Sequence, residues 1–253
     1  LRELGLEVHL ANPRKVRLIA ESTIKTDTVD ATALAHLLRM NWLPESRITP
    51  PAARLLRERL RYRITLVRIR GGLKCRIHSL LDKQGLDPPQ LSDLFGKTGR
   101  QWLAQARLAE EYRDNLDGYL RAIDFLGAEI SRVEKWLGRR TRKDHDIKLL
   151  TGIPGIGRFG ASLILAELGD IGFFPDKRKL SSFVGVVPGA DNSNLRRRDT
   201  GLKRDSNPYI RWLLAEAATK AMRVVPAWQR LYERIHAGNR KRRSKARMAV
   251  MHR

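Results

Sequence analysis

Apolar residues recur at helical spacing over most of this chain. In the segments 52–83 and 100–145 they are three or four positions apart, which is the period of one face of an α-helix. Between these segments lies the turn-rich stretch "QGLDPPQLSDLFG". Two long helices joined by such a hairpin predict an antiparallel coiled-coil arm, and an ordinary helical bundle is an equally good interpretation.

The N-terminal part has a mixed pattern. Leu6, Val8 and Leu10 alternate with other residues, which predicts a short strand. The segments 13–22 and 26–42 then follow a helical pattern. A strand followed by two helices is typical of the end of an α/β domain, so we expect a fragment whose earlier strands would precede Leu1.

The C-terminal part begins with a helix, a glycine hairpin and a second helix in "IKLLTGIPGIGRFGASLILAELGD". A basic, loop-rich stretch follows, and Asn207 with Pro208 then marks a helix start. The final segment is helical with a basic break at 238–245. We therefore predict a mostly α protein with three parts, at residues 1–48, 49–145 and 146–253.

The charge of the chain indicates its partner. There are 50 Lys and Arg residues against 27 Asp and Glu residues, a formal net charge of +23. Residues 139–253 hold 26 of the basic and 10 of the acidic residues. Such an excess indicates a polyanion, and DNA or RNA is the expected one. The single Cys75, the lack of a signal pattern and the lack of an apolar run of about 20 residues predict a cytoplasmic protein without membrane spans.

Two aspartates stand together at the start of the helix predicted over 26–42. Asp27 and Asp30 are three positions apart, which places their Cβ atoms about 5–6 Å apart on one helix face. Their carboxylates can jointly hold a Mg²⁺ ion, the metal that phosphodiester chemistry uses. On spacing alone the simpler interpretation is capping, with Asp27 as the N-cap and Asp30 in the first turn.

The stretch "GIPGIGRFGAS" fits a helix-hairpin-helix turn through Gly152, Gly155 and Gly157. Glycines let the backbone approach a phosphate, and the N–H groups that begin the next helix, at Arg158, point toward it. The alternative is a plain glycine turn between two packed helices. The basic surroundings favour phosphate binding.

A third candidate is Ser193, in "VPGADNSNLRRRDTGLKRDSN". A serine alkoxide can attack a phosphodiester while guanidinium groups stabilise the charge on phosphorus. No base stands nearby in sequence, so by itself Ser193 reads as a loop serine beside a phosphate-binding run. The cations of that run are Arg196, Arg197, Arg198, Lys203 and Arg204.

In this order, "KTDTVDATALAHLL", the arginine-rich arm, "LLTGIPGIGRFGASLILAELGD" and "FVGVVPGADNSNLRRR" with "SNPYIRWLLAEAA" resemble one family. It is the DEDD transposases of bacterial insertion sequences, more narrowly family one-ten, whose members are described as bridge-RNA-guided recombinases. The resemblance spans nearly the whole chain. It implies the remnant of a RuvC-like domain, a coiled-coil arm and a C-terminal transposase domain with a helix-hairpin-helix.

The resemblance also implies roles for residues. Asp27 and Asp30 match the last two of four acids that bind Mg²⁺ (or Mn²⁺), and Ser193 matches the nucleophile. Asn194 stands where the family usually has glycine, and the segment 206–211 matches a further motif in register. No carboxylate before residue 14 matches the first two acids, so we expect no recombination from this chain alone.

Partners follow from the same resemblance. They are DNA, a structured guide RNA and further copies of the chain in a homodimer or homotetramer, at the bacterial nucleoid. A metal site and a serine supplied by different subunits are also implied. Two other functions stay open on the residues: a non-enzymatic nucleic-acid-binding protein, and a metal-only nuclease of the Holliday-junction kind in which Ser193 is idle.

Overall fold

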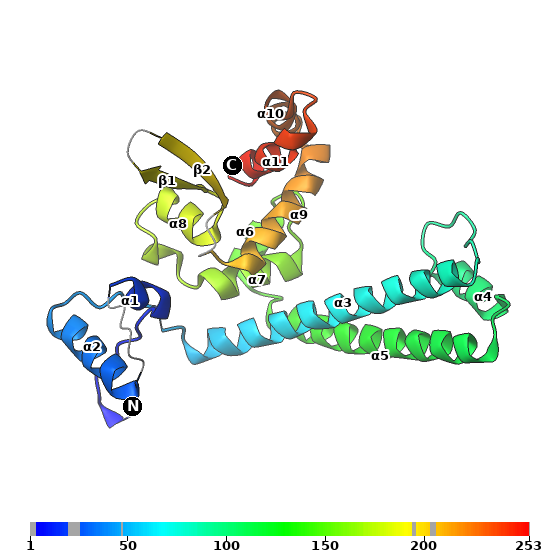
Figure 1. The fold of residues 1–253 in the computed structure, drawn as a ribbon, viewed down its shortest axis with the longest axis horizontal. Helices are drawn as coiled ribbons and strands as arrows, with labels where there is room; N and C mark the ends of the chain where they lie inside the picture. The colour runs from blue at the N-terminus through cyan, green and yellow to red at the C-terminus, as the bar shows by residue number, and fades with distance from the viewer. Residues whose placement is uncertain (1–3, 20–25, 47, 194–195, 203–205, 253) are drawn as a thin grey trace. The chain divides into compact units, whose positions relative to one another are not determined.

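The computed structural model describes residues 4–19, 26–46, 48–193, 196–202 and 206–252, and Figure 1 shows its ribbon. The chain divides into two compact units, Leu1–Ala52 and Ala53–Arg253. Most of the described residues are helical, which confirms the prediction of a mostly α protein. Among them, no helix is both long and apolar enough to cross a membrane.

The first unit holds the helices α1 (Pro13–Ile19) and α2 (Asp27–Arg39). Two backbone hydrogen bonds, from the Asn12 N–H to the Pro44 carbonyl and from the Ser46 N–H to the Leu10 carbonyl, join the segment before α1 to the segment after α2. Ala11 and Glu45 form one isolated antiparallel bridge there.

The strand predicted from the alternation of Leu6, Val8 and Leu10 is therefore wrong. Residues 6–10 have no regular secondary structure, and the pairing is limited to the single bridge. Alternation predicts a strand only where a partner strand can complete the hydrogen-bonded ladder. The described residues of this unit provide one bridge and no ladder.

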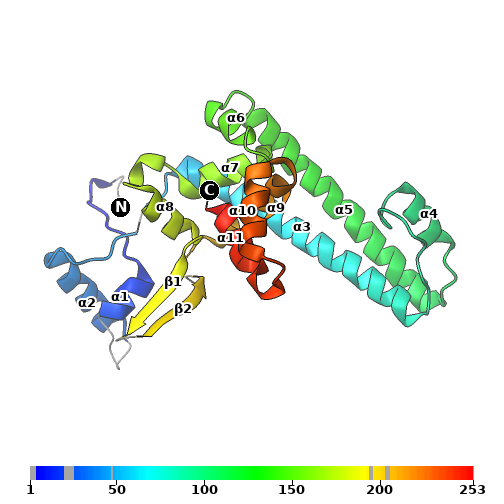
Figure 2. The same ribbon diagram turned by 90° about the horizontal axis from the view of Figure 1, so that it is seen from above.

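The second unit begins with a long helical arm. Helix α3 (Pro51–Lys83) starts at the end of the first unit and runs without a break through Gly71 and Gly72. Helix α5 (Glu110–Arg140) returns beside it, and both views show the two side by side (Figures 1 and 2). The middle of the pair is closed by an apolar cluster of Leu66, Leu126 and Ile130.

The far end of the arm has its own core. Helix α4 (Lys97–Gln105) packs there against the end of α3 and the start of α5 through seven buried residues. An ion pair of 2.5 Å between Arg100 and Asp124 joins α4 to α5. The buried residues are Ile77, Leu80, Leu81, Leu94, Leu103, Leu116 and Ile123.

The near end of the arm shares a core with the C-terminal helices. The cluster combines Leu60 and Ile64 of α3, Leu137 of α5 and buried residues of the helices that follow. In chain order, the elements after the arm are α6 (His145–Thr151), α7 (Arg158–Leu168), the 3₁₀ turn η2 (Ile171–Phe173), α8 (Lys177–Val184), the strands β1 (Pro188–Ser193) and β2 (Arg196–Leu202), α9 (Pro208–Val224), α10 (Pro226–His236), η3 (Arg240–Arg242) and α11 (Arg243–Met251). Of these elements, α6, α7 and α9 contribute buried residues to the cluster.

Two predictions about these helices are confirmed. The Asn207 side chain accepts hydrogen bonds from the N–H groups of Tyr209 and Ile210, with Pro208 in the first turn. The basic break predicted at 238–245 does separate α10 from α11, although α11 already begins at Arg243.

The bridge of the first unit generates a prediction about His9. Its Nδ1 lies 2.5 Å from a Glu45 carboxylate oxygen, and its Nε2 lies 3.2 Å from Glu7. The hydrogen bond to Glu45 raises the pKa of His9 above 6.5. The pair therefore stabilises the folded unit below pH 6.5, and this contribution fades as the pH rises through the folded-state pKa.

We expect an NMR titration of the His9 ring to give a midpoint above 6.5, and Glu45→Gln to lower it. A midpoint that does not respond to Glu45→Gln would contradict this assignment.

Candidate nucleic-acid interface and serine hairpin

The two aspartates lie in the first turn of α2. Thr26, and not Asp27, is the N-cap: its hydroxyl accepts a hydrogen bond of 3.3 Å from the Val29 N–H. The capping alternative was thus wrong about the capping residue, since a threonine one position earlier already supplies the acceptor. Asp27 and Asp30 are both exposed.

No group of three His, Cys, Asp or Glu side chains placed to hold a metal occurs among the described residues. A pair of exposed carboxylates suits a Mg²⁺ ion that keeps several water ligands and takes others from substrate phosphates. Asp27 and Asp30 therefore fit part of a metal site.

The serine lies on a β-hairpin where the sequence indicated a loop. Strands β1 and β2 are antiparallel, with an irregularity between Pro188 and Ala190. The register pairs Ser193 with Arg196, Asn192 with Arg197 and Asp191 with Arg198. The backbone of the hairpin therefore brings the predicted nucleophile directly opposite the first predicted arginine. Asn194, Lys203 and Arg204 lie outside the described residues.

The base of this hairpin is fixed on both sides. On one side Gly185 ends α8 with φ of +80°, and a Cβ there would collide with the Ser206 side chain. On the other side the Asn207 N–H donates to the Phe183 carbonyl at 3.1 Å, and Arg211 donates to the Ser206 hydroxyl at 2.9 Å. The residues just before β1 and just after β2 are thus packed against each other.

A buried carboxylate secures Asn207 in turn. Glu167, at the end of α7, is 3% exposed. Its oxygens accept two hydrogen bonds from Arg61, at 2.8 and 2.9 Å, and one from the Asn207 side-chain amide at 2.8 Å. Arg57 lies 3.4 Å from the same carboxylate and donates to the Ala166 carbonyl. We call these four residues, Arg57, Arg61, Glu167 and Asn207, the Glu167 cluster.

Within the Glu167 cluster, the carboxylate of Glu167 stabilises the charged form of Arg61. The bidentate hydrogen bond with Glu167 raises the pKa of Arg61 above its ordinary value. The Arg61 guanidinium also lies 4.6 Å from the centre of the Tyr209 ring, a cation–π contact at the start of α9. Because a buried carboxylate is costly unless paired and hydrogen-bonded, the cluster holds α3, α7 and α9 in one arrangement.

The glycine turn between α6 and α7 is shaped by packing as well as by backbone freedom. Gly155 has φ of +91°, and a Cβ there would lie 2.6 Å from the Ala217 carbonyl oxygen of α9. Gly152 ends α6, where a Cβ would meet the Leu149 carbonyl at 3.2 Å. Gly157 is the N-cap of α7, and nothing lies within 4 Å of its Cβ position. Of the three, Gly157 leaves its backbone open to an incoming group.

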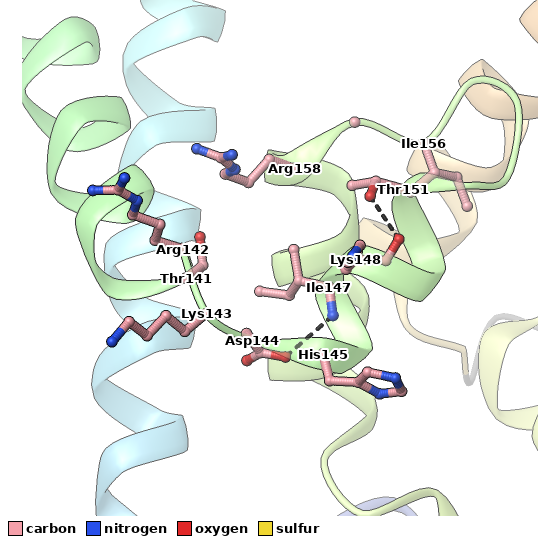
Figure 3. A pocket seen from close by; sticks show the side chains of 11 residues that line it. Thr141, Arg142, Lys143, Asp144, His145, Ile147, Lys148, Thr151, Ile156 and Arg158 are labelled. Carbon is pink, nitrogen blue, oxygen red and sulfur yellow. Dashed lines mark hydrogen bonds between the residues drawn. The ribbon is translucent and has the colours of Figure 1, made fainter.

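A pocket of about 730 Å³ lies beside this turn (Figure 3). It is framed by the loop that joins α5 to α6, by α6 itself and by the start of α7. We call it the basic pocket. Its lining residues are Thr141, Arg142, Lys143, Asp144, His145, Ile147, Lys148, Thr151, Ile156, Gly157 and Arg158.

Sequence patterns did not single out the Glu167 cluster. The available signals were one acid within the apolar run "ASLILAELGD" and two arginines four positions apart in the arm. A buried acid needs a partner, so the first signal points to a buried ion pair but not to its partner. Arg61 lies 106 positions away, and only the fold joins the two.

Two family profiles match the chain. Residues 1–84 match a transposase profile of the DEDD type from the IS110 group, and residues 147–233 match the profile described as "Transposase IS116/IS110/IS902 family". The first match includes helix α3 of the arm, and the second begins after α5, so the two follow each other in the order that the motifs indicate.

Curated relatives agree with these profiles. A family 20 transposase of Pseudomonas aeruginosa is 27% identical over 233 residues, which cover 88% of this chain and 67% of the relative. A transposase of Sinorhizobium fredii is 29% identical, with 89% and 58% covered. The transposase for insertion sequence element IS1111A of Coxiella burnetii is 26% identical, with 88% and 61% covered.

These matches define the class: the chain is homologous to transposases, the enzymes that cut and rejoin DNA in transposition. More narrowly, IS110-family transposase domains match its residues 1–84 and 147–233, which confirms the resemblance to transposases of this family. It spans 58–67% of the length of these relatives.

Removal of the buried carboxylate tests the Glu167 cluster. Glu167→Ala leaves Arg57 and Arg61 without their shared partner and one Asn207 donor unpaired. We expect the free energy of unfolding to fall by about 2–4 kcal/mol. This loss is slightly smaller than is usual when one partner of a buried ion pair is removed, because the two arginines keep some access to water. Chemical denaturation measures it.

The matched control is Glu134→Ala. Glu134 forms an ion pair of 2.6 Å with Arg63, and its carboxylate is more exposed than that of Glu167. This substitution is expected to cost less than about 1 kcal/mol. Equal losses from the two variants would contradict a special role for the Glu167 cluster.

The glycine turn offers a second matched pair. Gly155→Ala combines a left-handed backbone with a contact to the Ala217 backbone, and we expect a loss of about 2–4 kcal/mol. Gly157→Ala adds a methyl group in open space and is expected to cost less than about 1 kcal/mol. Thermal denaturation followed by circular dichroism compares the two, and the reverse order would show that the turn has another packing.

Proposed function

We propose that this chain serves in a DNA transposase of a mobile insertion element, which cuts and rejoins DNA strands with Ser193 as nucleophile. The order of the two family matches, at residues 1–84 and 147–233, carries this proposal. The anchored base of the β1–β2 hairpin adds support, because a nucleophile has to be held at a fixed position to attack efficiently.

In the proposed reaction, the Ser193 Oγ attacks the phosphorus of a DNA phosphodiester. A phosphoserine bond forms, one bridging P–O bond of the DNA breaks, and the released hydroxyl takes up a proton. Rejoining is the reverse exchange with another strand, so the energy of the bond is kept. Arg196, Arg197 and Arg198, on the strand paired with Ser193, are the proposed stabilisers of the charge on phosphorus.

Asp27 and Asp30 are the proposed carboxylates for a divalent cation, Mg²⁺ or Mn²⁺. Such an ion neutralises charge on phosphate oxygens during strand cleavage. The support is their exposed position in one helical turn, together with the DEDD type of the family that matches residues 1–84.

The proposed partners are target and donor DNA, a structured guide RNA and further copies of the chain, as a homodimer or homotetramer in the bacterial cytoplasm near the nucleoid. Gly157 and Arg158 are proposed phosphate contacts, while Gly152 and Gly155 shape the helix-hairpin-helix turn. Lys203 and Arg204, which come after β2 in the sequence, are proposed to bind phosphate together with the arginines of β2.

The substitution Ser193→Ala in a full-length transposase that carries these residues tests the proposal. Without the hydroxyl no phosphoserine bond can form, so covalent protein–DNA adducts should fall below detection, by about 10³-fold or more. Denaturing gels with end-labelled DNA detect the adduct, and DNA binding should stay within about twofold, since Ser193 carries no charge.

The other functions give different results in this assay. Adducts that persist in Ser193→Ala would place the nucleophile elsewhere. Metal-dependent cleavage without any adduct in the unsubstituted protein would favour the metal-only nuclease. Binding without either product would favour a non-enzymatic nucleic-acid-binding protein.

A further inference from the structure

We infer that the basic pocket is a binding site for the sugar–phosphate backbone of duplex DNA, separate from the serine hairpin. None of its lining residues comes from β1 or β2. The inference rests on the proposed function, in which Gly157 and Arg158 are phosphate contacts and DNA is the partner. It adds the loop between α5 and α6 to that site and names duplex DNA as its ligand.

The first observation is that the positive charges of the pocket are not neutralised by acidic side chains. Four cations line the pocket, namely Arg142, Lys143, Lys148 and Arg158, against the single carboxylate of Asp144. All four are exposed, and none of them forms an ion pair with another described residue. Cations that are left unpaired around a hollow attract a polyanion at close range.

The one acid of the pocket is already engaged. An oxygen of Asp144 accepts hydrogen bonds from the backbone N–H groups of Asp146 and Ile147, at 3.0 and 3.1 Å, and so caps α6. Figure 3 shows the carboxylate turned to the start of that helix, which directs its charge to the helix rather than to the arginines.

The second observation is shape. Ile147 and Ile156 are buried and supply the aliphatic part of the lining. Arg158 reaches from the start of α7 to the last turn of α5, where its Nη1 lies 3.5 Å from the position that a Cβ on Gly138 would take. In the view of Figure 3, the Arg142, Lys143 and Arg158 side chains extend to the same side.

The third observation is the open start of α7. Its N-cap, Gly157, supplies no side-chain hydrogen bond, and no atom lies within 4 Å of its Cβ position. Gly157 and Arg158 line the same pocket as the other three cations, and the first N–H groups of a helix have no partner within it. Backbone donors and side-chain cations together match a phosphate oxygen better than either does alone.

The lining also decides which nucleic acid fits. Proteins that hold single strands combine a basic groove with aromatic rings on which bases stack. The basic pocket has no Phe, Tyr or Trp among its lining residues. Cations without stacking rings contact the backbone of a duplex and do not read its bases.

Fluorescence anisotropy with this chain and a labelled DNA duplex tests the inference. The variant Arg142→Glu/Lys143→Glu should lower the affinity for duplex DNA by roughly tenfold or more. It should also reduce the slope of log K against log salt by about 2, one for each lost phosphate contact. A duplex of shuffled sequence should show the same losses, because backbone contacts carry no sequence information.

The control is Arg68→Glu/Arg76→Glu, which makes the same change in net charge at two exposed positions of α3. It should lower the affinity several-fold less than the pocket variant. Equal losses would mean diffuse attraction by the whole chain and would overturn the inference. A pocket variant that binds duplex DNA normally but loses structured RNA would overturn it as well.

Folding is checked by circular dichroism, and the neutral pair Arg142→Gln/Lys143→Gln replaces the reversed pair if the latter unfolds. The neutral pair should still reduce the salt slope. The assay measures binding, whereas the Ser193→Ala assay measures adducts, so the two proposals can fail independently.

Discussion

The arrangement of the second unit depends on one buried charge, the carboxylate of Glu167. A carboxylate at this depth is stable only because Arg57, Arg61 and Asn207 surround it with donors. These donors come from separate elements, because the arginines belong to the arm helix α3 and Asn207 caps α9 where the chain returns from the hairpin. The apolar core of Leu60, Leu137 and their neighbours could tolerate small shifts between helices, whereas a bidentate hydrogen bond specifies one distance and one angle.

Helix α7 connects this buried charge to the basic pocket. Its first residue, Arg158, lines the pocket, and Glu167 lies one residue before its end. An α-helix of this length spans roughly 16 Å and is stiff. A phosphate backbone held at one end of α7 would therefore be held at a fixed distance from the base of the serine hairpin at the other. DNA binding and the proposed chemistry then share one rigid element, although no lining residue of the pocket belongs to the hairpin.

Sequence patterns located the long helices, the Asn207–Pro208 helix start and the glycine turn, because helix periodicity and capping are local properties. They gave wrong predictions where the pairing of strands decides whether a segment forms a β-strand. Leu6, Val8 and Leu10 alternate like a strand but find one bridge, while the polar segment around Ser193 forms two strands despite its Gly, Asp and Asn content. Thr26 took the capping position assigned to Asp27, a shift of one residue that local rules leave undecided.

Residue patterns alone established the helical class, the basic character and, through the order of the motifs, the resemblance to transposases that the two profiles match. They also placed the candidate acids, the serine and the arginines on particular segments. The folded chain was needed to show that Gly155 packs on Ala217, that Ser193 pairs with Arg196 on a hairpin, and that Glu167 binds Arg61 from 106 positions away. The physical reason is that periodicity, caps and net charge act between neighbours in sequence, whereas burial and ion pairing act between residues that only the folded chain brings together.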